Sequence, residues 1–188
     1  MKIVAIDVET ADWGYPCEIG IAEIADGKIT DSKSWLIKPS CFPKMNARHQ
    51  AIHGIITEQL EQAPTFKEIW SELKPYIEGV LLVAHNVKFD IDCIVSEMQR
   101  LKIKTKPLHG YCTCLQAREH LNIPSHKLDA VCKHLGIEIG NHHRAEHDAN
   151  QDWRNQSRHW ATGKRRILQK RSRRLGQWQY KECFRNRW

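Results

Sequence analysis

The strongest constraint on the fold is a short apolar segment that ends in two acids. Residues 2–9 read KIVAIDVE, a β-branched run typical of a buried strand. Asp7 and Glu9 are two residues apart, so on a strand both side chains lie on the same face. Two carboxylates on a half-buried face repel each other and lose solvation unless a cation lies between them. The segment predicts either a cation site on a sheet or an exposed strand end with solvated acids.

The chain up to residue 160 predicts an α/β domain. Further strands are expected at 18–26, 28–37, 79–85 and 107–112, with a hairpin turn at Gly27 joining the first two. Helices are expected over 46–62 (broken at Gly54), after Thr65, and over 88–101, 113–122, 127–135 and 144–160, with Thr57 and Thr65 as caps. Three strands followed by helices that alternate with two more strands predict a mixed central sheet flanked by helices.

The positive charge of the chain is concentrated at its C-terminal end. Residues 163–188 contain ten Lys or Arg and one acid, which leaves 19 basic and 21 acidic residues in 1–162. We therefore predict a nearly neutral domain over 1–162 and a basic, disordered tail over 163–188. Four of the seven Trp residues lie in 153–188, among arginines. The tail is interpreted either as a solvated extension or as a segment that attracts phosphates through its charge.

The cysteine content and the hydropathy of the chain indicate the cellular compartment to expect. The seven cysteines are an odd number with no CxxC pair, which indicates reduced thiols rather than a disulfide framework or a zinc site. No apolar run approaches the roughly 20 residues of a bilayer span. The apolar run at the N-terminus meets Asp7 and is too short for a signal peptide. We expect a cytoplasmic protein that does not interact with membranes.

Further candidate metal ligands follow in two other segments. Asp90 comes after a buried strand and VKF, where it could equally be an acid that favours the start of a helix. His143 and Asp148 are five residues apart in HHRAEHDA, so a loop-to-helix turn can aim both at one point. Carboxylates with a single imidazole suit Mg²⁺ or Mn²⁺, and two such ions can stabilise both oxygens of a phosphoryl transfer. The set predicts phosphodiester hydrolysis, with a histidine suited to deprotonate the attacking water.

Four sequence motifs together resemble those of one protein family. They are Asp7-Val8-Glu9-Thr10, Ile52-His53-Gly54-Ile55, Ala84-His85-Asn86-Val87-Lys88-Phe89-Asp90 and His143-x-Ala145-x-x-Asp148-Ala149. In this order and over residues 1–160, they resemble the DEDDh (DnaQ-like) 3′→5′ exonucleases, the superfamily of the proofreading epsilon subunit of bacterial DNA polymerase III. The resemblance implies an RNase H-like fold and hydrolysis with two metal ions.

The resemblance also implies a role for each site residue. Asp7, Glu9 and Asp148 would hold one ion, Asp7 would bridge to the second, and Asp90 would support that second ion through water. His143 would be the general base, because it occupies the position of the family's histidine five residues before the last aspartate.

Residues near the substrate are implied in the same way. Thr10 and His53 would contact the last nucleotide; Phe89 would pack near the site or in the core, and Asn86 would touch substrate or brace the turn between strand and helix. The stretch 10–13, TADW, lacks the Thr-Gly pair common in the family at this point. Trp13 is expected either to stack on a base or to cover the strand end.

Three functions fit these observations. The first is a 3′→5′ exonuclease that releases nucleoside monophosphates from DNA 3′ ends in proofreading, repair or trimming, alone or as a DNA polymerase subunit. The second is an exoribonuclease acting on RNA ends or short oligonucleotides, because no residue indicates how the 2′-hydroxyl is read. The third is an inactive module that binds nucleic acid or a polymerase, against which the complete catalytic set argues.

Overall fold

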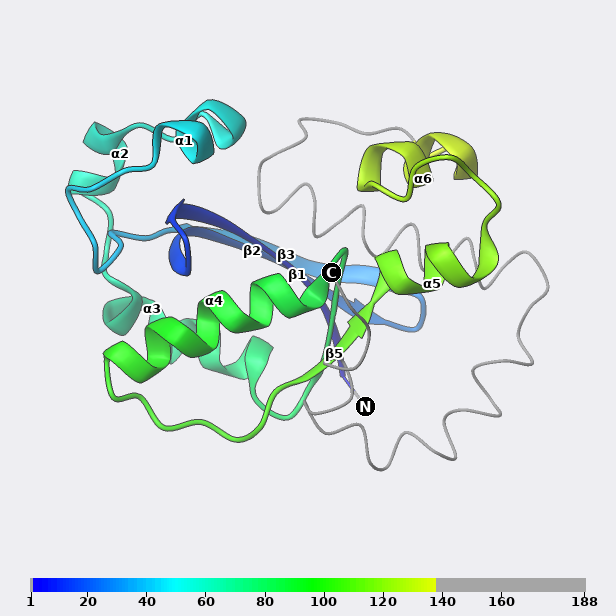
Figure 1. The fold of residues 1–188 in the computed structure, drawn as a ribbon. Coiled ribbons are helices and arrows are strands. Elements are labelled where there is room, and N and C mark those ends of the chain that lie inside the picture. The colour runs from blue at the N-terminus through cyan, green and yellow to red at the C-terminus, as the bar shows by residue number, and fades with distance from the viewer. Residues whose placement is uncertain (1, 138–188) are drawn as a thin grey trace.

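The computed structural model of the chain describes residues 2–137 (Figure 1). Its strands are β1 (Ile3–Asp12), β2 (Tyr15–Ala25), β3 (Lys28–Leu36), β4 (Leu81–Ala84) and β5 (His109–Cys112). Its helices are α1 (Ala47–His53), α2 (Thr57–Glu61), α3 (Phe66–Ile77), α4 (Val87–Arg100), α5 (Thr113–His120) and α6 (Leu128–Leu135). The helix expected over 144–160 and the tail over 163–188 lie outside the described residues.

The strands form one mixed sheet in the order β3-β2-β1-β4-β5. The first three strands pair antiparallel as a meander, whereas β4 and β5 run parallel to β1. Strand β4 pairs with β1 only from Ile3 to Ala5, while β1 continues to Asp12. The second half of β1 therefore has no strand partner on its β4 side among the described residues. The predicted mixed α/β architecture is confirmed.

The main core lies between one face of the sheet and the helices α3 and α4. Val4, Ile6 and Val8 from β1 and Ile19 and Ile21 from β2 are all buried on this face. The helices contribute Phe66, Ile69, Leu73, Ile77, Ile91 and Ile94. Full burial of one such side chain stabilises the fold by about 1.5–3 kcal/mol. Because side chains alternate along a strand, this packing turns the residues between them, including Asp7 and Glu9, to the other face.

Smaller elements lie beside the ends of the strands, with α1 and α2 near the end of β1 and α5 and α6 following β5 in the chain (Figure 1). Ala11 and Cys17 from the β1–β2 hairpin pack on Ile55 and Leu60, in a separate cluster from the main core. This cluster fixes α2 and the segment between α1 and α2 against the β1–β2 hairpin, beyond Glu9.

The local signals in the sequence produce most of the expected turns and caps. Asp26 and Gly27 both have positive φ, as a two-residue hairpin turn requires. The Thr65 hydroxyl accepts from the backbone N–H of Glu68, and the Glu68 carboxylate accepts from the backbone N–H of Thr65. Thr57 is instead the first residue of α2. Its predicted capping role is wrong, because Ile56 occupies the cap position and its N–H donates to Gln59 Oε1.

Within residues 2–137, no helix has the length and apolar character needed to cross a lipid bilayer.

Candidate active site

Asp7 and Glu9 project from β1 on the face opposite the main core. In the antiparallel pairing with β2, Asp7 lies opposite Gly20 and Glu9 lies opposite Glu18. Both acids are half-buried. The sequence places them there because the residues that alternate with them, Ile6 and Val8, are drawn into the core. The two carboxylates therefore lie on one face of the sheet, as the strand alternation predicts.

Asp90 comes to the same strand from the first turn of α4. Its Oδ1 accepts a hydrogen bond from the backbone N–H of Val8 at 3.0 Å. That N–H needs a partner because β4 ends before it reaches this part of β1. The bond fixes the Asp90 carboxyl at the edge of β1, at the residue that Asp7 and Glu9 flank in the chain.

The environment of Asp90 disfavours its charged form. The residue is only 3% exposed. Burial, with a smaller contribution from the charge of Glu9, raises the pKa of the Asp90 carboxyl from 3.8 to about 8. Asp92, two residues on, is half-buried and pairs with Lys88 along the same helix, so it does not share this environment. A buried carboxyl beside a second carboxylate is an electrostatic setting that a cation would relieve.

Thr10 and His53 lie together where α1 meets the end of β1. The carbonyl of Thr10 accepts from Nε2 of His53 at 3.2 Å, and the N–H of Ile55 donates to Nδ1 of the same ring at 3.0 Å. His53 is therefore buried and neutral, with its proton on Nε2. The Thr10 hydroxyl lies 2.9 Å from Nδ1 of His49, a histidine that the sequence gave no reason to place here. The structure brings Thr10 and His53 next to Glu9, and their contact with a nucleotide stays a prediction.

The other predicted substrate residues occupy different settings. Asn86 is exposed and adopts the left-handed conformation (φ 80°) at the N-terminus of α4, without a side-chain hydrogen bond that caps the helix. Phe89 is half-buried and packs against the main core. Trp13 is 71% exposed at the β1–β2 turn, with its ring edge-on to His49 at a centroid distance of 4.9 Å. Both interpretations of Trp13 remain open.

The described residues carry three of the five predicted catalytic side chains. His143 and Asp148 lie outside them. Within residues 2–137, no group of three His, Cys, Asp or Glu side chains converges closely enough to hold a metal ion. The donors that are present are carboxylate oxygens, which suit a hard divalent cation. The environment of Asp90 fits such an ion on electrostatic grounds.

Glu18 is an acid on this face that the sequence interpretation passed over. It is 2% exposed, and its Oε1 accepts a hydrogen bond from the Ser34 hydroxyl at 2.8 Å. It lies opposite Glu9 in the β1–β2 register. The signal was available, because the alternation in 18–26 places Glu18 on the same face as Gly20 and Ala22. The strand register that places Glu18 opposite Glu9 could not be inferred from the sequence.

Comparison with known proteins identifies the family. The family model described as "Exonuclease" (RNase_T) matches residues 4–154, which include all the predicted catalytic residues. The chain belongs to the DEDDh (DnaQ-like) exonuclease family. Its resemblance to that family, inferred from four motifs, is confirmed. The family is one of metal-dependent exonucleases.

Two relatives match this chain over part of their own length. The DNA polymerase III subunit epsilon of Buchnera aphidicola is 31% identical over 162 residues, covering 79% of this chain and 68% of that protein. The PolC-type DNA polymerase III of Thermotoga petrophila is 33% identical over 132 residues, covering 70% of this chain. The match spans only 10% of that polymerase.

A solved structure confirms the fold. The nuclease domain of 3′hExo, a DEDDh family member bound to rAMP, aligns with a TM-score of 0.72 at 19% identity. The alignment covers 86% of this chain and 92% of that domain. The RNase H-like mixed sheet flanked by helices, expected from the family resemblance, is thereby confirmed.

Proposed function

We propose that the protein is a metal-dependent 3′→5′ exonuclease that hydrolyses phosphodiester bonds at DNA 3′ ends and releases nucleoside monophosphates. The observation that carries the proposal is the Asp90–Val8 hydrogen bond, which brings a carboxyl from α4 to the residue between Asp7 and Glu9 in the β1 sequence. Three carboxyls from two elements on a family-matched domain suit metal-assisted phosphodiester hydrolysis. We also propose that residues 1–162 form the exonuclease domain and that residues 163–188 form a basic tail.

The roles of the side chains follow the family pattern. Asp7, Glu9 and Asp148 would hold one Mg²⁺ or Mn²⁺, with Asp7 shared with a second ion that Asp90 supports through water. When bound, these ions supply charge stabilisation to the attacking and leaving oxygens. His143 would accept the proton of the attacking water. The hydrogen bond between Asp90 and the Val8 N–H holds the start of α4 against β1. It would thereby keep the carboxyls of the two elements close to one site.

Substrate residues form a second part of the proposal. Thr10 would contact the last nucleotide from the end of β1, where its carbonyl and hydroxyl are already held by His53 and His49. His53 would act mainly by positioning, because both of its ring nitrogens make hydrogen bonds within the protein. Asn86 would contact substrate from the exposed start of α4, and Phe89 would support the site from the core.

DNA is the favoured substrate because one relative is named as a subunit of DNA polymerase III and the other as a PolC-type DNA polymerase III. On the same ground, a polymerase is the proposed partner, and cytoplasmic DNA replication or repair is the proposed role. Exoribonuclease activity is the second candidate, because the similar 3′hExo domain was solved with rAMP. An inactive binding module is the third, and the complete set of Asp7, Glu9, Asp90, His143 and Asp148 in the sequence argues against it.

The test replaces one carboxylate with an amide. Asp7→Asn keeps the size and the strand position and removes the charge, so we expect cleavage of 5′-labelled single-stranded DNA to fall at least about a hundredfold. Asp26→Asn is the matched control. It removes the same charge at the β2–β3 turn, where asparagine tolerates positive φ, and should cleave like the wild-type protein. Equal activity in all three proteins would remove the proposed metal site.

A further inference from the structure

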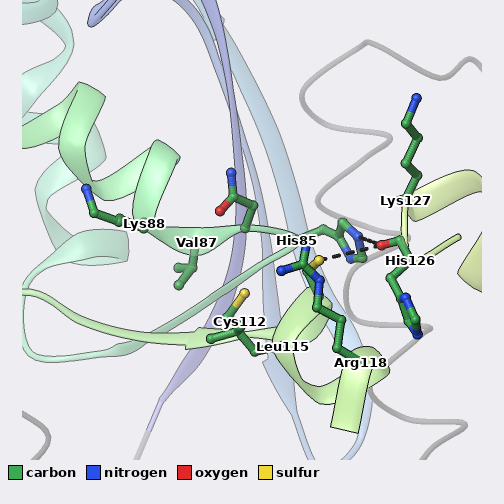
Figure 2. Close-up of a pocket in the computed structure, with 10 residues that line it drawn as sticks. His85, Val87, Lys88, Cys112, Leu115, Arg118, His126 and Lys127 are labelled. Atoms are coloured by element: carbon green, nitrogen blue, oxygen red, sulfur yellow. Dashed lines mark hydrogen bonds between the residues drawn. The ribbon is translucent and has the colours of Figure 1, made fainter. Parts of the chain in front are cut away.

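A pocket of about 430 Å³ opens beside the N-terminus of α4, at the carboxyl ends of β4 and β5 (Figure 2). Its walls come from three separate segments, 85–88, 112–118 and 126–127. None of the residues that line it is acidic, and Lys88, Arg118 and Lys127 are basic. Of the residues given a role above, only Asn86 lines this pocket. Its volume is in the range of sites that bind small ligands.

Hydrogen bonds between the three segments hold the wall of the pocket in place. Nε2 of His85 donates to the carbonyl of His126 at 2.8 Å, and the Cys114 thiol donates to the same carbonyl at 3.5 Å (Figure 2). Nδ1 of His85 lies 3.0 Å from the Thr113 hydroxyl, and the ring of His126 donates to the carbonyl of Leu121. These bonds tie the start of α4 to α5 and to the loop before α6. A wall fixed in this way loses little freedom when a ligand binds.

Arg118 is the cation best placed to meet a ligand in the pocket. Its side chain is directed towards His85, whereas Lys88 and Lys127 extend away from it (Figure 2). Among residues 2–137, neither Arg118 nor Lys127 makes an ion pair, while Lys88 pairs with Asp92. The planar fork of a guanidinium matches the oxygens of a phosphate. The charge of Arg118 is therefore available for an anion.

An apolar surface lies beside this cation. Leu115 lines the pocket and is 51% exposed, and Val87 and Cys112 also belong to the lining. A single phosphate would leave this apolar area uncovered. A nucleotide carries both a phosphate and an apolar sugar and base face, and it matches the pairing of Arg118 with Leu115.

We propose that this pocket is a second substrate subsite that binds one nucleotide of the strand upstream of the scissile bond. Its phosphate would bind Arg118, and its sugar or base would lie against Leu115. This inference rests on the proposed exonuclease function. The pocket borders the catalytic residues, because Val87 in its wall begins α4 and precedes Asp90 by three residues, a rise of roughly 4.5 Å along the helix. Lys127 at the rim adds attraction for the neighbouring phosphates.

The test compares two substrates that differ only in whether they reach the pocket. The long substrate is a single-stranded DNA oligonucleotide, and the short one is the p-nitrophenyl ester of thymidine 5′-monophosphate, which carries one nucleotide. For Arg118→Gln, we expect KM for the oligonucleotide to rise about tenfold more than KM for the ester. The slope of log(1/KM) against log salt should become shallower by about 0.7, the value for one lost single-strand phosphate contact.

The matched control is Lys67→Gln, which removes one exposed positive charge from α3 on the other side of the molecule. It should change neither the KM ratio nor the salt slope, which excludes a general effect of net charge. Leu115→Ser is the second variant and should raise KM for the oligonucleotide with the salt slope unchanged, because it removes only apolar contact. Thermal melting verifies that each variant is folded.

The outcomes distinguish a failure of the proposed subsite from a failure of the proposed exonuclease activity. If the wild-type protein cleaves neither substrate, the proposed function fails. If the wild-type protein cleaves both, and Arg118→Gln leaves KM unchanged or raises it equally for the two substrates, the activity stands and the subsite is overturned. A larger rise for the oligonucleotide with the shallower salt slope supports the subsite.

Discussion

Replacing Asp90 with asparagine should remove the pH dependence of stability that this buried carboxyl imposes on the metal-free protein. The folded protein raises the Asp90 pKa from 3.8 to about 8, chiefly through burial. Between these values, the folded state holds a proton that the unfolded state has released. Stability is therefore lost as the pH rises through this window. In the Asp90→Asn variant the side-chain amide carries no charge, and its carbonyl oxygen can still accept from the Val8 N–H.

The size of the effect follows from linkage. One group bound to a proton only in the folded state changes the free energy of unfolding by about 1.4 kcal/mol for each pH unit. The difference in stability between Asp90→Asn and wild type should therefore grow in favour of the variant from pH 5 to pH 7.5, by up to about 3 kcal/mol. Asp90→Ala, which also removes the acceptor of the Val8 N–H, should lose about 1–3 kcal/mol relative to Asp90→Asn at every pH.

The assay is urea denaturation in EDTA, followed by tryptophan fluorescence and circular dichroism at several pH values. Comparing variant with wild type cancels the titration of groups that both proteins share. Parallel stability curves for Asp90→Asn and wild type across this pH range would refute the reasoning, because they would show that the Asp90 carboxyl does not keep its proton in the folded state.

Two further predictions concern the rest of the chain. Arg100 donates to the carbonyl of Gly14 at 2.7 Å and to the carboxylate of Glu97 at 2.6 Å. Arg100→Met should cost about 2–4 kcal/mol by urea denaturation, because within residues 2–137 it leaves the buried Glu97 carboxylate with only the Ser40 hydroxyl as a partner. An unchanged midpoint would contradict this. Deleting 163–188 should weaken nucleic-acid binding and flatten its salt dependence in a filter-binding titration. An identical salt slope with and without the tail would show that it takes no part in binding.

The sequence was sufficient to predict the parts of the fold that depend on local pattern. The alternation around Asp7 and Glu9 placed both acids on one face, and Gly27 and Thr65 marked a turn and a cap that the structure contains. These signals are strong because strand alternation, positive φ and capping each depend on a few adjacent residues. Thr57 failed as a cap because several residues in one loop can start a helix, and α2 begins at Thr57 itself with Ile56 as its cap.

Contacts between distant segments were beyond the sequence interpretation. The hydrogen bond from Val8 to Asp90 exists because β4 stops short of this part of β1, and no local pattern gives the length of that pairing. The pairing of Glu9 with Glu18 depends on register in the same way. The pocket around Arg118 combines three separate segments between residues 85 and 127, and its leucine and arginine look like ordinary residues on an exposed helix. Such features require the tertiary fold.

The central claim is tested most directly by a gel time course with matched 5′-labelled single-stranded DNA and RNA, each with Mg²⁺, with Mn²⁺ and with EDTA. The account predicts a ladder that shortens one nucleotide at a time from the 3′ end, requires the divalent cation, and forms faster on DNA. A faster ladder on RNA would replace the substrate proposal with the exoribonuclease alternative. Binding of either strand without any metal-dependent cleavage would contradict the account and favour an inactive nucleic-acid-binding module.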